Sequence, residues 1–176
     1  REELISRHLT TERLIRPLIG GAEFLRSINR YCLWIEDDNL SFAKSIKEIN
    51  RRIEGVYEFR KNGGDVARTL IDKSHQFRYR KEALKSFLVI PCTTSERREY
   101  MQCGYFDSNY ISMNSLQVIY DSELYVFSIL SSKIHMKWIK TVGGRLKEDY
   151  RYSTQLCYNT FPFPNISKQR KEELTQ

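Results

Sequence analysis

Charged side chains of opposite sign alternate along residues 143–158, GGRLKEDYRYSTQLCY. Lys147, Asp149 and Arg151 occupy every second position, so an extended strand would turn all three toward one face. The lysine and the aspartate would then offer a hydrogen-bond donor and an acceptor about 6–7 Å apart along the strand. Such a pair can bind a partner that presents an acceptor beside a donor.

A G·C base pair presents that pattern in the major groove of DNA. Guanine offers acceptors there and cytosine offers an amino donor, so Lys147 and Asp149 could together satisfy one G·C pair. Arg151 would extend base recognition or contact a phosphate. A cross-strand salt bridge that neutralises both charges explains the same spacing equally well, and the spacing alone leaves both interpretations open.

A second basic group lies on a predicted helix that precedes this strand. Lys133, Lys137 and Lys140 recur at i, i+4 and i+7, which aligns them on one helix face. A row of lysines suits phosphate contacts, which position a protein on DNA without discriminating between sequences. Arg145 adds another cation beyond the helix. A solvated helix face followed by a charged hairpin is the alternative interpretation.

Hydrogen-bonding side chains also gather in the segment TTSERREY at residues 93–100. Ser95, Arg97 and Arg98 are expected on one turn between strands, where an arginine could bond bidentately to guanine. Glu96 in the same turn could accept a hydrogen bond from cytosine. A turn held together by its own salt bridges is the alternative.

No catalytic constellation is evident from the residue types and their spacing. His135 lies between apolar positions of the predicted helix with nothing nearby in sequence to orient it, so a packed histidine or one facing a phosphate is favoured over a general base. The glycine pairs at 63–64 and 143–144 fit no nucleotide-binding motif. The four cysteines and three histidines are scattered and complete no zinc pattern, so we expect free thiols.

Composition favours a packed, basic domain. The chain has 176 residues, with Lys plus Arg exceeding Asp plus Glu by 29 against 22, a formal net charge of +7. This excess favours an anionic partner, nucleic acid before membrane. Separately, no apolar run approaches the ~18 residues needed to span a bilayer. The chain begins with Arg1 rather than Met, and we expect it to be a fragment of a longer protein.

Hydrophobic periodicity predicts an α+β fold: a mixed or antiparallel sheet of short strands, two main helices and long polar DNA-reading loops. The predicted strands cover 31–35, 85–91, 98–106, 116–120 and about 150–158. The main helices cover 44–61 and 124–142. The core face predicted for the second helix consists of Leu124, Phe127, Ile134, Trp138 and Val142.

Several blocks resemble, in order, the target recognition domain of the MmeI-like type IIG/IIL restriction–modification enzymes. The resemblance covers about residues 12–164. It rests on the combination of RYCLWIEDDN (30–39), RIEGVYEFR (52–60), IPCTTSERREY (90–100), LYVFSILSSKIHMKWIKTVGGRLKEDYRYS (124–153) and YNTFPFP (158–164).

The resemblance implies that Lys147 and Asp149, just after the GRL motif, specify a guanine in the target. It implies further base-specifying positions at Arg151, Asn114 and Ser115. The expected domains are a helical lead-in over 1–16, the recognition domain over 17–164, and the start of a C-terminal helical extension over 165–176.

The resemblance also implies a bacterial parent enzyme with an endonuclease and an S-adenosylmethionine-dependent adenine methyltransferase in one polypeptide. We expect Mg²⁺ and S-adenosylmethionine to serve the parent, and no cofactor, metal or catalytic residue to lie in this fragment. Its expected partners are double-stranded DNA and the methyltransferase domain, in the cytoplasm near the nucleoid. The alternatives are an RNA-binding or RNA-modifying domain that uses His135 or Cys157, and a basic docking domain without a nucleic-acid ligand.

Overall fold

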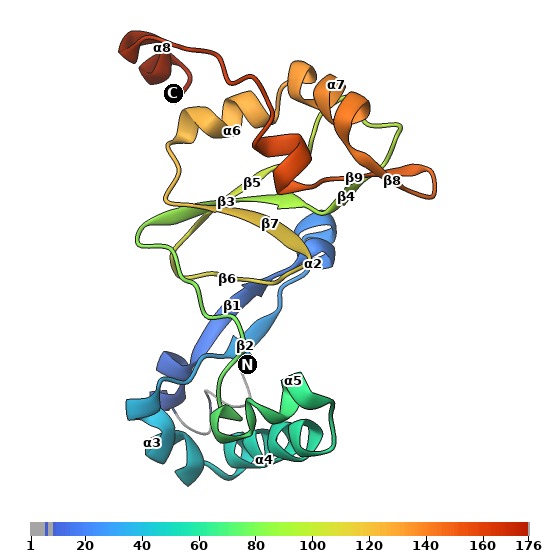
Figure 1. The fold of residues 1–176 in the computed structure, drawn as a ribbon. Helices are drawn as coiled ribbons and strands as arrows, with labels where there is room; N and C mark the ends of the chain where they lie inside the picture. Colours follow the sequence, from blue (N-terminus) through green and yellow to red (C-terminus); the bar gives the residue numbers. More distant parts are fainter. Residues whose placement is uncertain (1–5, 7–8, 176) are drawn as a thin grey trace. The chain divides into compact units, whose positions relative to one another are not determined.

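A computed structural model describes Ser6 and residues 9–175, which form two compact units (Figure 1). The first, the helical unit, consists of the described residues up to Pro17 together with Tyr31–Lys81. The second, the sheet unit, consists of Leu18–Arg30 and the described residues from Glu82 onward. Each unit has helices and short strands of mixed or antiparallel pairing, which confirms the predicted α+β class.

The helical unit packs short helices around branched aliphatic side chains. Its elements are η1 (Leu9–Leu14), the start of β1 (Ile15–Ile19), β2 (Tyr31–Leu33), η2 (Asp37–Asn39), α3 (Leu40–Ser45), α4 (Lys47–Lys61), α5 (Asp65–Arg68) and η3 (Ile71–Lys73). The helix predicted over 44–61 is therefore interrupted at Ile46, whose extended backbone (ψ 110°) caps α4. Ile46, Ile49 and Ile53 still form the core with Leu14 and Ile35, as their spacing predicts.

Arg60 at the end of α4 fastens the segment that follows α5. Its guanidinium donates hydrogen bonds to the carbonyl oxygens of Leu70 (2.7 Å), Lys73 (2.6 Å) and Gln76 (2.7 Å). One planar group thus donates to three carbonyls of the segment that follows α5. Nearby, the carboxylate of Asp37 accepts from Lys73 and His75, so it serves as an ion-pair partner and not as a helix cap.

The sheet unit is built around the buried strand β3. Its elements are the end of β1, α2 (Gly21–Arg26), β3 (Ser86–Pro91), β4 (Thr93–Thr94), β5 (Gly104–Asp107), β6 (Ile111–Ser112), β7 (Leu116–Tyr120), α6 (Leu124–Leu130), α7 (Lys133–Val142), β8 (Gly144–Leu146), β9 (Asp149–Arg151), η4 (Thr154–Tyr158) and α8 (Lys168–Glu173). β3 pairs antiparallel with β5 and β7, and β9 pairs antiparallel with β4 and β8.

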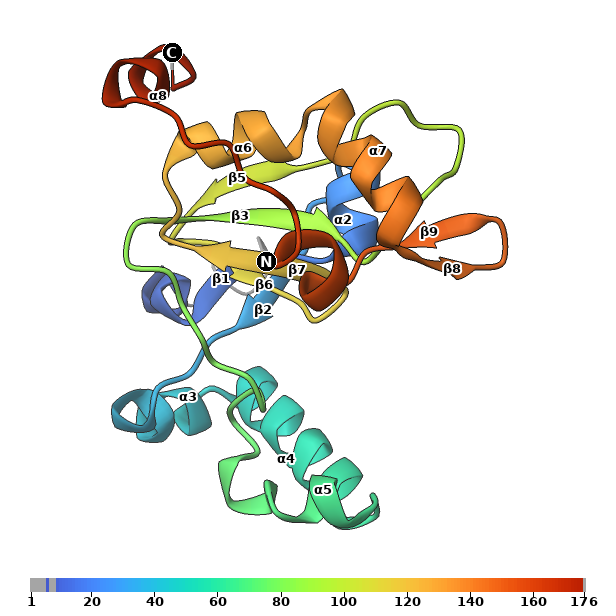
Figure 2. The same cartoon turned by 45° about the horizontal axis from the view of Figure 1, so that its top comes forward.

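The two faces of β3 bury different partners. Leu88 and Ile90 pack with residues of α6 and α7, which cover one face of the β5–β3–β7 sheet (Figures 1 and 2). Phe87 and Val89 point to the opposite face and pack with Ile19. The sheet therefore fixes α7 on one side, and α7 in turn lies directly before the β8–β9 hairpin.

The helix predicted over 124–142 is two helices, and its predicted core face is wrong at Ile134, whereas Phe127 and Val142 pack against the core as predicted. Ser131 and Ser132 separate α6 from α7, and the Ser132 hydroxyl accepts a hydrogen bond from the His135 amide as the α7 N-cap (3.2 Å). This break changes the phase of the helix. Ile134 is consequently 72% exposed, whereas His135, Met136 and Ile139 are buried.

The terminal segments are described in part. Within the lead-in predicted over 1–16, Leu9–Leu14 form a 3₁₀-helix, and residues 1–5, 7 and 8 lie outside the described residues. Within 165–176, α8 begins after Ser167, whose hydroxyl accepts from the Arg170 amide (3.3 Å), and Gln176 lies outside the described residues. The domain limits at residues 16 and 165 stay predictions.

Removing the Arg60 guanidinium should destabilise the helical unit. We expect Arg60→Met to lower the free energy of unfolding by about 2 kcal/mol, because charge-assisted hydrogen bonds to three carbonyls are lost together. Arg51→Met, an exposed position on the same helix, should change it by less than about 0.5 kcal/mol. Urea denaturation of the purified chain measures both, and equal effects of the two substitutions would contradict this role of Arg60.

Candidate nucleic-acid interface

The segment around Lys147 is a tight hairpin and not one continuous strand. β8 and β9 pair with Leu146 opposite Asp149, which leaves Lys147 and Glu148 as a two-residue loop (Figure 2). Lys147 has a φ of 57°, so the first loop position is left-handed, as in a type II′ turn. The prediction that Lys147, Asp149 and Arg151 alternate along one strand is therefore wrong for Lys147, because the chain reverses at that residue.

The hairpin has a buried and an exposed face. Directly opposed residues of an antiparallel pair lie on the same face, and successive residues alternate. Arg145 lies opposite Tyr150, which is buried in the core with α7, so this pair forms the inner face. Leu146 and Asp149 form the outer face and are exposed, as is Arg151 in the next outward position.

Arg145 holds the hairpin from its inner face. Its guanidinium lies 4.4 Å from the centroid of the Tyr150 ring, donates to the Tyr150 hydroxyl (2.9 Å) and donates to the Glu148 carbonyl (3.2 Å). An ion pair of 3.4 Å also joins Arg145 to Glu96. These contacts fix the loop around Lys147, so Arg145, expected at a phosphate, has intramolecular partners instead.

The turn at residues 95–98 lies beside this hairpin. β4 pairs with β9 through Thr93 opposite Arg151, and the chain then turns with the Arg98 amide donating to the Ser95 carbonyl (3.2 Å). Arg97 and Arg98 are exposed, while Glu96 pairs with Arg145 as described above. The turn thus contains both a salt bridge, formed by Glu96, and two exposed basic side chains, Arg97 and Arg98.

The loop at Asn114 and Ser115 meets the same region through Cys92. The Cys92 amide donates to the Ser115 carbonyl (3.3 Å), and the Cys92 carbonyl accepts from the Tyr152 amide (2.9 Å). The Ser115 hydroxyl accepts from the Gly21 amide (2.9 Å), so it is occupied with holding the start of α2. Asn114 is exposed. Three predicted segments, at 95–98, 114–115 and 147–151, are therefore brought together.

The predicted lysine row on α7 is exposed, but its members differ. Lys133 forms an ion pair with Glu99 (3.2 Å) and lies 5.3 Å from the Tyr100 ring, and hydrogen bonds to these two residues raise the pKa of Lys133. Lys140 lies 5.9 Å from the Tyr150 ring, below the hairpin. Lys137 has no ion-pair partner among the described residues. Lys137 and Lys140 are thus the members best placed for an external anion.

His135 is a core residue. Its ring is fully buried, with Nε2 3.2 Å from the Tyr152 hydroxyl and with Phe161 packed edge-on at 4.6 Å between centroids. Burial lowers the pKa of His135 to about 4. Cys157 is also fully buried, and burial raises its pKa. Neither residue is accessible to an RNA substrate, so the structure gives no support to the RNA-modifying alternative.

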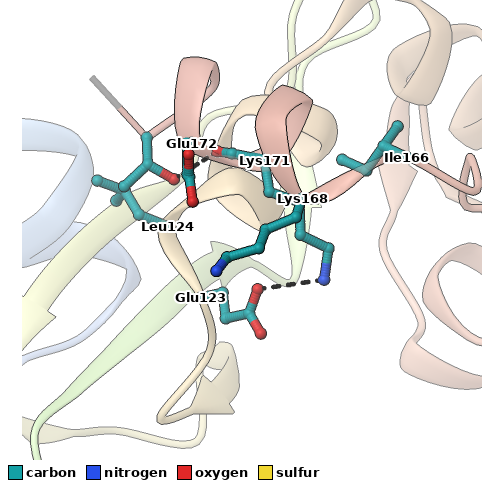
Figure 3. A pocket seen from close by; sticks show the side chains of 7 residues that line it. Glu123, Leu124, Ile166, Lys168, Lys171 and Glu172 are labelled. Atoms are coloured by element: carbon teal, nitrogen blue, oxygen red, sulfur yellow. Dashed lines mark hydrogen bonds and ion pairs between the residues drawn. The ribbon is translucent and has the colours of Figure 1, made fainter.

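A shallow pocket of about 820 Å³ lies between α6 and α8, apart from the hairpin (Figure 3). Glu123, Lys168, Lys171 and Glu172 line it, with Glu123 and Lys171 paired at 3.3 Å. Within residues 6 and 9–175, no group of three His, Cys, Asp or Glu side chains could hold a metal ion, and no helix is long and apolar enough to cross a membrane.

Comparisons with known proteins identify a family. The family model described as "MmeI, target recognition domain" matches residues 1–165. DNA methyltransferase A of Bacillus subtilis (strain 168) is 39% identical over 162 residues, which are 92% of this chain and 18% of that protein. A solved structure of the type IIL restriction-modification enzyme MmeI in complex with DNA is 33% identical with a TM-score of 0.88, covering 97% of this chain and 23% of that one. The chain thus spans about a fifth of the length of these relatives.

The backbone at Lys147 should be strained, because left-handed φ costs about 1–2 kcal/mol for a residue with a β-carbon. We expect Lys147→Gly to raise the free energy of unfolding by about 1 kcal/mol. Glu148→Gly, at the next loop position where φ is not positive, should not raise it. Chemical denaturation of both variants measures the difference, and stabilisation of equal size in both would contradict the turn assigned here.

Burial of His135 should make the domain less stable in mild acid. The unfolded histidine gains a proton near pH 6.5, whereas the folded one gains it only near pH 4, so stability falls as the pH drops through this window. From pH 7 to pH 5 we expect a loss of about 2 kcal/mol that His135→Gln largely removes. Denaturation at the two pH values tests this, and an unchanged pH dependence in the variant would refute it.

Proposed function

Because the chain belongs to the family of MmeI target recognition domains, we propose that it recognises a specific sequence of double-stranded DNA for a restriction–modification enzyme. The observation that carries the proposal is the exposed end of the β8–β9 hairpin. Lys147 and Asp149 lie there, two residues apart in the sequence, and no ion pair among the described residues joins them. Self-neutralisation, the alternative that their spacing left open, therefore receives no support.

In this proposal the hairpin end enters the major groove. The Lys147 ammonium donates to the guanine acceptors of one G·C pair, and the Asp149 carboxylate accepts from the cytosine amino group. An aspartate facing DNA repels phosphate, so a protein that bound only the backbone would gain nothing from it. The mixed charge therefore favours base recognition over general affinity for nucleic acid.

The side chains around the hairpin end have different roles. Arg151, Arg97, Arg98 and Asn114 are exposed and free to contact neighbouring bases or phosphates. Ser95 and Ser115 hold loop backbones, and we assign them to positioning rather than to base contacts.

Phosphate contacts fall to the lysine row of α7. Lys137 and Lys140 contact phosphates directly, and Lys133 joins them if DNA displaces Glu99 from its ion pair. Arg145 acts through the hairpin conformation and not through DNA.

The longer protein is proposed to carry the chemistry. By analogy with its relatives, other segments would bind S-adenosylmethionine to methylate adenine and Mg²⁺ to cleave DNA, in the bacterial cytoplasm. The methyltransferase domain of the same polypeptide would hold the opposite side of the duplex. The part described here would then supply specificity and no catalytic residue.

Exchanging the charges at the hairpin end should change the recognised base. In the full-length enzyme, Lys147→Glu combined with Asp149→Arg should alter the preferred base at one position of the target, while methylation continues. Each lost base contact should cost about 1–3 kcal/mol of discrimination. Mapping of methylated adenines in a host genome measures the target before and after, and an unchanged target would contradict the assignment of these two residues.

Lys137→Ala provides the matched control for a general loss of affinity. It should weaken binding to all sequences alike and reduce the salt dependence, because it removes a phosphate contact and no base contact. A change of target in the control would mean that α7 and not the hairpin recognises bases.

A further inference from the structure

We propose that Leu146 is a further specificity-determining residue, whose side chain contacts the 5-methyl group of a thymine beside the G·C pair recognised by Asp149. The inference rests on the proposed function and extends it from polar to apolar recognition. Leu146 is the last residue of the GRL motif, but neither the charge pattern of the sequence nor the resemblance gives it a role in base recognition. The hairpin register does so.

Leu146 shares the outer face of the hairpin with Asp149. The two residues are directly opposed across the β8–β9 pair, which brings their β-carbons within about 4.5–5.5 Å of each other. Neighbouring base pairs in DNA are stacked about 3.4 Å apart along the helix axis. A side chain beside Asp149 therefore reaches the base pair next to the one that Asp149 contacts.

The described sheet unit leaves about half of the surface of this leucine uncovered. It is 54% exposed, and it belongs to none of the apolar clusters that form around β3. Its neighbours in sequence fix the backbone on both sides: Arg145 packs on Tyr150, and Lys147 occupies the left-handed position of the turn. The hairpin thus presents one apolar side chain rigidly among charged ones.

The major groove offers one kind of apolar group to such a side chain. Among the four bases only thymine carries a methyl group there, and apolar contact with it is a known mode of base recognition. A leucine cannot replace a lysine at a phosphate, because it has no charge to neutralise. The surrounding Lys147, Asp149 and Arg151 also disfavour an apolar protein surface as the partner.

Deoxyuridine substitution tests the contact by removing only the methyl group. In the full-length enzyme, with its target known, each thymine of the site is replaced in turn and single-turnover methylation is measured. One replacement should lower the single-turnover rate constant divided by Kd by about fourfold, because one methyl-sized group is no longer buried. Leu146→Ala should be insensitive to the same replacement, and so should Leu146→Asn, which keeps the size of the side chain.

Leu156→Ala is the matched control, since this leucine is 49% exposed in the same unit but lies on η4. It should retain the fourfold preference for thymine. The inference is overturned if the unmodified enzyme never distinguishes thymine from uracil, or if Leu146→Ala lowers methylation equally on both. Either result leaves the charge exchange at Lys147 and Asp149 free to succeed, so the two proposals fail separately.

Discussion

The packing of the Arg145 guanidinium on the Tyr150 ring is the interaction on which the proposed recognition surface depends. The ring is part of the core beneath α7, and the same guanidinium bonds the Tyr150 hydroxyl and the Glu148 carbonyl. A two-residue loop with a lysine in the left-handed region would not persist without such support. Arg145 therefore links the buried Tyr150 ring to the loop backbone and so fixes the position of the hairpin end.

The two faces of the hairpin have different tasks: the inner face packs on the core, and the outer face carries the proposed recognition residues. Its inner face is tied to the fold through Tyr150 and, two residues later, through the hydrogen bond between Tyr152 and His135. Its outer face carries Leu146 and Asp149, which contribute no packing to the core. Changes on the outer face can therefore alter what is recognised with little effect on folding, as expected for a domain that determines specificity.

The sequence predicted the α+β class correctly, but not the local arrangement of the residues at the candidate interface. The short apolar segment LQVIY correctly located the strand at 116–120. Alternation of charges misled at Lys147, since a turn formed by lysine lacks the Asn-Gly or Asp-Gly signal of most tight hairpins. Helical periodicity misplaced Ile134 because Ser132 caps a new helix and resets its phase. The role of Arg145 depends on contacts across the sheet, which spacing along the chain cannot reveal.

A structure of the full-length enzyme bound to its own target would test the central claim most directly. The account predicts the β8–β9 hairpin in the major groove, with the Lys147 ammonium and the Asp149 carboxylate within hydrogen-bonding distance of one G·C pair and Arg145 still packed on Tyr150. A complex in which the hairpin end faces solvent or another protein segment, while other residues contact that base pair, would contradict it.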